Sequence, residues 1–235
     1  MKAFLLAAGY GTRLKPLTDT TPKCLIPIHG KPLMEWWFDL FVKHGITEVL
    51  VNTHYLAKQV EDFVADYQRE HAEILIKTVY EPELLGSGGT IYNNLDFVNK
   101  ESSFFICYAD NLTDLDLTAM MQYHHAHSGS LTMALFHAPH PEQCGIATVN
   151  ADGKIINFIE KPEQPESNLA NAGIYIASRE VISMLSDQKP LDFGFDVLPK
   201  LAGSMNGYPT DCFLMDTGTF ENYQKAEKEW LYDYL

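Results

Sequence analysis

The sequence predicts an α/β protein with a mostly parallel sheet, helices on both faces and a β-rich second half. Strand-like and helix-like segments alternate through the first half of the chain, whereas strand-like segments dominate the second half. The 235 residues, 46% hydrophobic and 20% charged, are enough to bury a substantial core. Alternation of strands and helices favours a parallel sheet with right-handed crossover connections.

Local patterns predict the individual elements. An apolar run over 3–8 is typical of a buried strand, and apolar residues at helical spacing predict a helix from Leu33 to Lys43, ended by Gly45. Further strands are expected over 48–52, 74–79, 104–107, 131–136, 145–149, 154–158, 172–177 and 211–215, and further helices over 56–70, 90–97 and 220–231. A hairpin turn is expected at 150–153.

Composition excludes several classes of protein. The net charge of −14 argues against binding to DNA or RNA. No apolar stretch approaches the ~20 residues of a membrane span. The four cysteines are scattered without metal-binding spacing, so we expect buried, reduced thiols in a cytoplasmic protein.

The first apolar strand runs into a glycine-containing loop. Gly9 and Gly11 are followed by Thr12, Arg13 and Lys23. Glycine lets backbone N–H groups turn toward an anion, and the two cations add positive charge, so we expect a polyphosphate ligand. The spacing departs from the G-x-x-x-x-G-K-S/T loop and lacks the third glycine of the dinucleotide fingerprint, which makes a nucleotide-dependent dehydrogenase a poor candidate.

Two aspartates are candidates for a metal site. Asp110 follows the apolar strand 104–107, at the carboxyl edge of the expected sheet where ligands bind. Asp216 begins the string Asp-Thr-Gly-Thr219, in which Thr219 is a good helix N-cap. Each aspartate alone could simply bond within its turn. Together they predict a site for Mg²⁺, which prefers carboxylate and phosphate oxygens.

These strings, with Glu160-Lys161-Pro162 and Asn171-Ala-Gly173, resemble the motifs of the nucleotidyltransferases that make nucleoside-diphosphate sugars. The resemblance extends over almost the whole chain, with Ala109 standing where the family carries glycine before the first aspartate. It implies a Rossmann-like, GT-A-like fold over 1–235 as a single catalytic domain. About 1–115 would bind the nucleotide and about 116–235 the sugar phosphate. A homo-oligomer is left open.

The resemblance also implies residue roles. Arg13 and Lys23 would be catalytic, and Asp110 and Asp216 would bind Mg²⁺. Nucleotide contacts would come from Leu6, Ala7, Ala8, Gly9, Gly11, Thr12, Glu81, Gly86, Ser87 and Gly88. Sugar-phosphate contacts would come from Gly145, Glu160, Lys161, Asn171 and Gly173.

The substrates are less sharply defined. Bacterial mannose-1-phosphate guanylyltransferase-like proteins show the greatest similarity to three strings, which are Thr21-Pro-Lys-Cys-Leu-Ile-Pro-Ile28, Gly30-Lys-Pro-Leu33 and Ala109-Asp-Asn-Leu-Thr-Asp114. This similarity favours GTP and a mannose-type sugar 1-phosphate. The runner-up is a uridylyl- or thymidylyltransferase for a glucose- or aminosugar-type phosphate. A catalytically inactive sensing protein stays open as an alternative. The joint presence of five charged motif residues argues against it, and these are Arg13, Lys23, Asp110, Lys161 and Asp216. His124, His125 and His127 could suggest a metal site, but a solvated helix face is the favoured interpretation.

Overall fold

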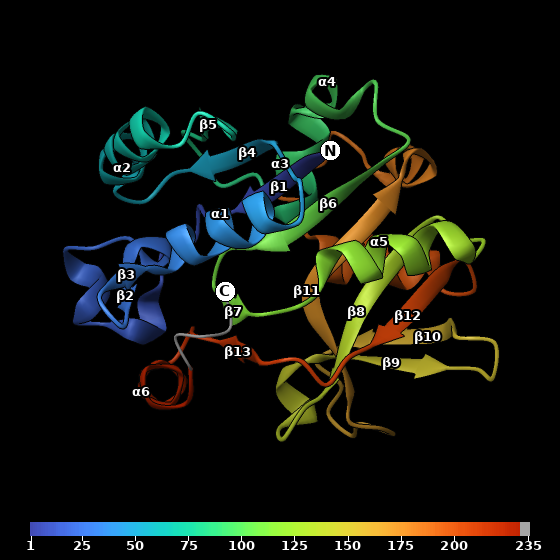
Figure 1. Ribbon diagram of the computed structural model, residues 1–235. Coiled ribbons are helices and arrows are strands. Elements are labelled where there is room, and N and C mark those ends of the chain that lie inside the picture. The colour runs from blue at the N-terminus through green and yellow to red at the C-terminus, as the bar shows by residue number, and fades with distance from the viewer. Residues whose placement is uncertain (231–235) are drawn as a thin grey trace. The chain divides into compact units, whose positions relative to one another are not determined.

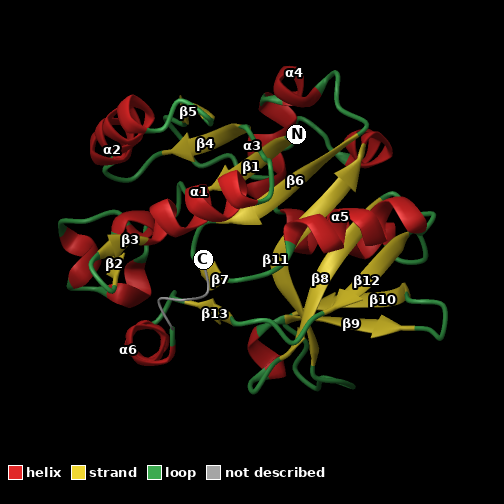
Figure 2. Cartoon of the chain, viewed as in Figure 1, coloured by secondary structure: helices red, strands yellow, loops and turns green. Residues whose placement is uncertain are grey.

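The computed structural model describes residues 1–230 and divides into two compact units. The first unit comprises residues 1–84, 107–115 and the chain from 212 onward, and the second comprises 85–106 and 116–211. These units differ from the sequence halves 1–115 and 116–235 at residues 85–106 and at the C-terminal segment. The fold is α/β, as expected, with parallel pairing in one unit and largely antiparallel pairing in the other (Figures 1 and 2).

Parallel strands form the centre of the first unit. β1 (Lys2–Leu6) pairs with β4 (Glu48–Thr53), which pairs with β5 (Leu75–Tyr80). In the register, Leu6 lies opposite Asn52, and Thr53 opposite Tyr80, so all three strands end at one edge of the sheet. The sequence patterns predict that the ligand binds at this carboxyl edge.

Helices and short ribbons complete the first unit. The helices are α1 (Leu33–Lys43), α2 (Ala57–Glu70) and α6 (Phe220–Glu229), and the small antiparallel pairs are β2 (Pro27–Ile28) with β3 (Lys31–Pro32) and β7 (Asn111–Thr113) with β13 (Leu214–Asp216). Trp36 and Trp230 join Leu112 and Ala226 in a buried cluster that anchors α6.

The second unit is built on a mixed sheet. Its strands are β8 (Leu131–His137), β9 (Gly145–Val149), β10 (Lys154–Glu160), β11 (Leu169–Ser178) and β12 (Met205–Pro209), in the order β11-β8-β12-β10-β9. β12 runs parallel to β8, and the other pairs are antiparallel. The helices are α3 (Ser87–Asn93), α4 (Leu95–Val98) and α5 (Leu117–Ala126). β6 (Ser103–Tyr108) begins in the second unit and ends in the first.

Several predicted elements are confirmed and others are wrong. The helix Leu33–Lys43, the strand Gly145–Val149 and the turn from Asn150 to Gly153 are confirmed. The strand expected over 211–215 begins only at Leu214, because the Phe213 N–H donates to the Asp114 side chain instead of to a neighbouring strand. The helix expected from 90 begins at Ser87, and β12 was missed. Leu231, the expected end of the last helix, lies outside the described residues.

His124 is buried, so a solvated face is the wrong interpretation for it. Its side chain is 5% exposed, and its two ring nitrogens contact the hydroxyls of Thr132 and Ser178. Burial lowers the pKa of His124 to about 4. Among residues 1–230, no group of three or more His, Cys, Asp or Glu side chains is arranged to hold a metal ion.

The remaining composition-based expectations concern cysteines and membranes. All four cysteines are free thiols, with Cys24 and Cys107 buried and Cys144 and Cys212 only partly so. Within the described part of the chain, no helix combines the length and the hydropathy needed to cross a bilayer.

Candidate functional site

The loop after β1 is shaped by a left-handed glycine and a short 3-10 turn. Gly11 has φ +64°, and a Cβ there would lie 2.8 Å from Thr18 Cγ2. The carbonyl of Gly11 accepts from Leu14 N at 3.0 Å and from Thr18 Oγ1 at 2.8 Å. Both the dihedral angle and the contact require glycine at this position. Thr12 and Arg13 follow in the exposed 3-10 turn.

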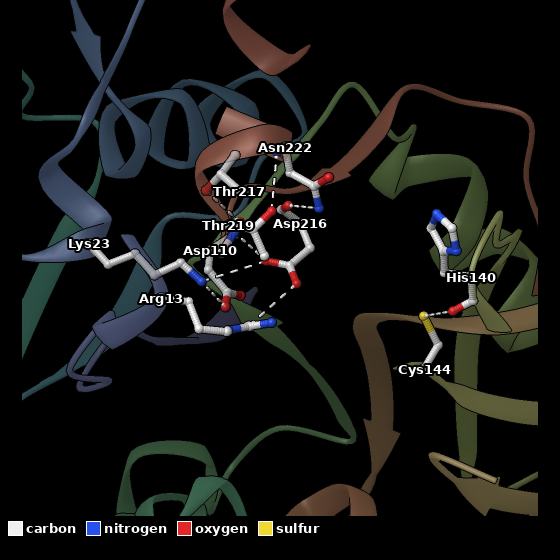
Figure 3. A network of polar contacts seen from close by, with 10 residues as sticks. Arg13, Lys23, Asp110, His140, Cys144, Asp216, Thr217, Thr219 and Asn222 are labelled. Carbon is white, nitrogen blue, oxygen red and sulfur yellow. Dashed lines mark hydrogen bonds and ion pairs between the residues drawn. The ribbon is translucent and has the colours of Figure 1, made fainter. Parts of the chain in front are cut away.

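Two cations and two carboxylates meet in the first unit. Lys23 Nζ lies 2.6 Å from Asp110 Oδ2 and 3.6 Å from Asp216 Oδ1, and Arg13 Nη2 lies 3.9 Å from Asp216 Oδ2 (Figure 3). The Lys23 side chain is 11% exposed, whereas that of Arg13 is 62% exposed. The structure therefore brings together four residues that lie far apart in the sequence.

Gly218 lies directly against the charged groups of this cluster. A Cβ on it would lie 2.7 Å from Asp216 Oδ1, 2.7 Å from Lys23 Nζ and 2.8 Å from Arg13 Nη2. Any side chain at this position would therefore displace the charged groups themselves. The glycine of the Asp-Thr-Gly-Thr string is explained by this close approach.

Asp216 reaches the cluster by a route that the sequence did not suggest. It is the last residue of β13, opposite Asn111 of β7 in a separate antiparallel ribbon, and does not follow a strand of the parallel sheet. Thr217 donates both its N–H and its hydroxyl to the carbonyl of Asp110, each at 2.9 Å. Thr219 caps α6 as expected, accepting from Asn222 N.

Other cations near the loop are paired elsewhere. Lys15 Nζ lies 3.2 Å from Asp19, and Lys31 contacts Asp39 while lying 3.9 Å from the centroid of the Trp36 ring. The positive charge aimed at the cluster thus comes from Arg13 and Lys23.

The expected base-contacting residues divide between the units. In the first, Ala7 N donates to Asn52 Oδ1 at 2.7 Å, and Asn52 Nδ2 donates to the buried Glu81 carboxylate at 3.0 Å. A ligand contact from the Ala7 amide would have to share that bond. Leu6, Ala8 and Gly9 flank it on the chain, and nothing among the described residues lies within 4 Å of a Cβ built on Gly9. Packing therefore does not explain that glycine.

The glycine turn at the start of α3 belongs to the second unit. Gly86 has φ +79°, and a Cβ there would lie 2.4 Å from the carbonyl oxygen of Leu191. The Gly88 and Gly89 amides donate to that same oxygen at 2.9 and 3.1 Å. Ser87 Oγ accepts from Phe193 N at 2.8 Å. A nucleotide contact from the Gly88 amide would have to compete with Leu191.

Glu160 carries a buried oxygen with no hydrogen-bond partner. Glu160 is the last residue of β10, opposite Gly145 of β9, and its Oε2 has no partner among the described groups. A Cβ on Gly145 would lie 2.5 Å from that oxygen, and one on Gly194 would lie 3.1 Å from it. Burial, with Asp192 nearby, raises the pKa of Glu160, and the neighbouring Lys161 opposes this. A buried acceptor between two glycines is suited to a hydroxyl donor.

Lys161 occupies an unusual backbone conformation. Its φ is +50°, a region that lysine rarely adopts, and its N–H donates to the Cys144 carbonyl at 3.0 Å. Its Nζ lies 5.9 Å from the centroid of the Phe195 ring, which is itself exposed. Cys144 also donates its thiol to the His140 carbonyl at 3.7 Å (Figure 3).

Asn171 and Gly173 both lie in an irregular part of β11, which begins at Leu169 rather than at the expected residue 172. The register of β11 with β8 shifts between Asn171 and Tyr175. Asn171 Nδ2 donates to the Tyr175 hydroxyl at 2.7 Å, and its Oδ1 accepts from Gly173 N at 2.9 Å. Gly173 has φ +69°, which accounts for the glycine in this bulge.

Sequence reasoning missed several polar residues around these groups. Asp192 and Gly194 lie beside Glu160, while Asn52 and His54 lie beside the Glu81 segment. The polar string Asn52-Thr-His-Tyr55 directly after a buried strand was a usable signal for the second pair.

Comparison with known proteins places this geometry in a family. The model for the family described as nucleotidyl transferase matches residues 2–232. The chain is 34% identical, over 96% of its length and 62% of the relative's, to the UTP--glucose-1-phosphate uridylyltransferase of Synechocystis sp.. It is 31% identical, over 92% of its length and 59% of the relative's, to the mannose-1-phosphate guanylyltransferase catalytic subunit beta of Drosophila pseudoobscura. The chain thus spans less than two thirds of these relatives.

A solved structure supports the same fold. The crystal structure of HddC from Yersinia pseudotuberculosis, complexed with GMP-PN, is 26% identical and superposes with a TM-score of 0.76, covering 97% of this chain and 98% of that one. The motifs, the fold and the match over nearly every residue lead to one conclusion: the chain belongs to the nucleotidyl transferase family.

Proposed function

We propose that the protein is a sugar-1-phosphate nucleotidyltransferase, which joins a nucleoside triphosphate to a sugar 1-phosphate and releases pyrophosphate. The observation that carries the proposal is the cluster of Arg13, Lys23, Asp110 and Asp216 around Gly218. A triphosphate changes its charge distribution most at the phosphate groups during this reaction. Fixed cations at that point are the most effective means of lowering the barrier.

The reaction needs no general base. A phosphate monoester has a second pKa of about 6, so the attacking oxygen of the sugar phosphate is already anionic at neutral pH. That oxygen would attack the α-phosphorus, and the bond to the bridging oxygen of pyrophosphate would break. Arg13 would neutralise the departing pyrophosphate, Lys23 the phosphates around the α-phosphorus, and Lys161 would hold the sugar phosphate.

The residues of the cluster fit a Mg²⁺ ion. Asp110 and Asp216 both direct carboxylate oxygens at the single Lys23 ammonium, so the same oxygens converge on one cation. Mg²⁺ binds through one or two carboxylates together with substrate phosphates and water, and does not need a cage of three or more protein ligands. When bound, the ion would neutralise phosphate charge.

The sugar end of the substrate would meet Glu160. Its buried Oε2 lacks a partner, which is costly unless a ligand supplies a donor. A sugar hydroxyl is such a donor, and Gly145 and Gly194 contribute no side chain of their own beside that oxygen. Asn171 and Gly173 would add contacts from the β11 bulge.

GTP and a mannose-type 1-phosphate are the substrates we favour. Support comes from the motif similarity in Thr21–Ile28, Gly30–Leu33 and Ala109–Asp114, from the guanylyltransferase relative and from the GMP-PN bound by HddC. The uridylyltransferase relative keeps UTP and glucose 1-phosphate as the second candidate.

The test is a matrix of four nucleoside triphosphates against several sugar 1-phosphates with Mg²⁺, read by pyrophosphate release. The proposal expects release that depends on both substrates, highest with GTP and mannose 1-phosphate. Highest release with UTP and glucose 1-phosphate would select the second candidate. Tight nucleotide binding without pyrophosphate from any pair would indicate a sensing protein.

A further inference from the structure

One short segment of the first unit makes three hydrogen bonds to the glycine loop, which we define as residues 7–18. The segment is Asn52–Tyr55, at the end of β4. The three contacts join Asn52 Oδ1 to Ala7 N at 2.7 Å, His54 Nε2 to the Tyr10 hydroxyl at 2.9 Å, and the Tyr55 hydroxyl to the Thr18 carbonyl at 2.8 Å. Three side chains within four residues thus hydrogen-bond to the loop at Ala7, Tyr10 and Thr18.

The direction of the central contact follows from its surroundings. His54 Nδ1 lies 2.7 Å from the backbone oxygen of Glu81, which can only accept a hydrogen bond. Nδ1 therefore carries a proton, and in the tautomer with Nδ1 alone protonated Nε2 is an acceptor. In that tautomer the Tyr10 hydroxyl donates to His54.

The contacts close into a circuit that begins and ends on the loop. From Ala7 it passes to Asn52, whose Nδ2 donates to the Glu81 carboxylate at 3.0 Å, then through the Glu81 backbone oxygen to His54, and back to Tyr10. Glu81 is only 2% exposed, so the circuit is anchored in the protein interior. The two ends of the circuit thus meet on one buried residue, through its carboxylate and through its backbone oxygen.

Tyr10 supplies the side chain between the two glycines of the loop. It stands between Gly9 and Gly11, which impose little conformational restraint of their own. Its ring packs edge-on against His54 at 5.2 Å and lies 5.8 Å from Tyr55, although 48% of the residue is exposed. Within 9–11, the Tyr10 side chain is thus the only one that can fix the loop.

We propose that Tyr10 and His54 are positioning residues that hold the glycine loop in its anion-binding shape before the triphosphate arrives. The inference rests on the proposed function in taking the ligand of the loop to be a triphosphate. A loop that is already ordered does not lose conformational entropy on binding, so its affinity for that ligand is higher.

The test compares Tyr10→Phe with Tyr80→Phe, a matched control in the same unit whose residue is 55% exposed. Loss of one neutral hydrogen bond should raise the KM for the triphosphate roughly two- to tenfold in Tyr10→Phe and leave the KM for the sugar phosphate unchanged. His54→Asn keeps a donor near the Nδ1 position but removes the Nε2 acceptor. It should match Tyr10→Phe, and the double variant should be no worse than either.

Hydrogen exchange of the ligand-free proteins provides the second readout. The amides of residues 9–13 should exchange faster in Tyr10→Phe and His54→Asn, and at the wild-type rate in Tyr80→Phe. Unchanged exchange, additive effects in the double variant or an equal rise in both KM values would overturn the positioning role. If wild-type protein makes no pyrophosphate from any substrate pair, the proposed function fails, but the exchange comparison still decides this inference.

Discussion

The two units differ in how their candidate ligand-binding groups are paired. In the first, two cations are already paired with two carboxylates around Gly218, and the loop that leads to them is tied by hydrogen bonds. In the second, Glu160 has an unpaired buried oxygen and Lys161 has a left-handed backbone. Charge is thus already paired where the polyphosphate is expected, whereas on the expected sugar side one buried carboxylate oxygen has no partner among the described groups.

Metal removal should have the largest effect and should act through the first unit. Excess chelator should abolish turnover, because Asp110 and Asp216 would otherwise hold Mg²⁺ against the phosphates. Asp110→Asn and Asp216→Asn should each raise the Mg²⁺ concentration needed for half-maximal rate or abolish turnover. Asp39→Asn, which changes a carboxylate paired with Lys31, is the control. Full activity in excess chelator would contradict the predicted requirement for Mg²⁺.

Loss of either cation of the cluster should be nearly as severe. Arg13→Ala and Lys23→Ala should each lower kcat by about 10²–10³, the typical effect of removing one electrostatic contact to the transition state. Lys15→Ala is the matched control, because the Lys15 side chain is about as exposed as that of Arg13 but pairs with Asp19. Circular dichroism should show all three variants folded. A kcat near that of wild type in either cluster variant would contradict its role.

Lys161→Ala should affect one substrate only. Hydrogen bonds to charged groups contribute about 1.5–3 kcal/mol, so the KM for the sugar 1-phosphate should rise roughly ten- to a hundredfold. Triphosphate affinity, measured by calorimetry, should change little. Lys154→Ala, at the other end of β10, controls for loss of a lysine from the same strand. Weakened triphosphate binding with an unchanged sugar-phosphate KM would assign Lys161 to the nucleotide instead.

Glu160→Gln should give the smallest effect. It should stabilise the fold at pH 8 and at the same time weaken binding of the sugar phosphate. Burial raises the pKa of Glu160 above its ordinary 4.5, so the folded state favours the protonated carboxyl. This favourable contribution is complete below pH 4.5 and is lost as pH rises through the raised pKa. Glutamine avoids the charge, so the variant should melt at a higher temperature than wild type at pH 8 and at about the same temperature at pH 4.

The KM of Glu160→Gln for sugar phosphate should nevertheless rise, since an amide has one acceptor oxygen where the carboxylate has two. Calorimetric melting across this pH range and steady-state kinetics check the two halves. A variant that is less stable than wild type at pH 8 would show that the buried oxygen is satisfied in solution.

Much of the charge cluster could be predicted from the sequence because short strings carry it. Asp110 follows a strand, and Asp216 lies in a string whose glycine is needed for close approach. The parts that could not be predicted depend on pairing between distant segments. Whether β13 pairs with β7 or with the main sheet is decided by tertiary contacts, and so is the burial of His124 beside Thr132 and Ser178.

The same limit applies to the second unit. Glu160 and Gly145 could be named as candidates from the sequence. Gly194 could not, because it lies beside Glu160 only after the chain returns more than thirty residues later. Single residues in loops give no periodic signal, so such convergence can be recognised only in three dimensions.

³¹P NMR of the protein with GTP, mannose 1-phosphate and Mg²⁺ shows which phosphorus atom of the triphosphate is attacked. Attack on the α-phosphorus predicts pyrophosphate and a phosphorus pair of a nucleoside-diphosphate sugar, appearing in equal amounts. Each of the other triphosphate and sugar-phosphate pairs is examined in the same way. Formation of nucleoside diphosphate with a bisphosphorylated sugar or free phosphate would mean attack at the γ-phosphorus, and that result, or no product from any pair, would contradict the account.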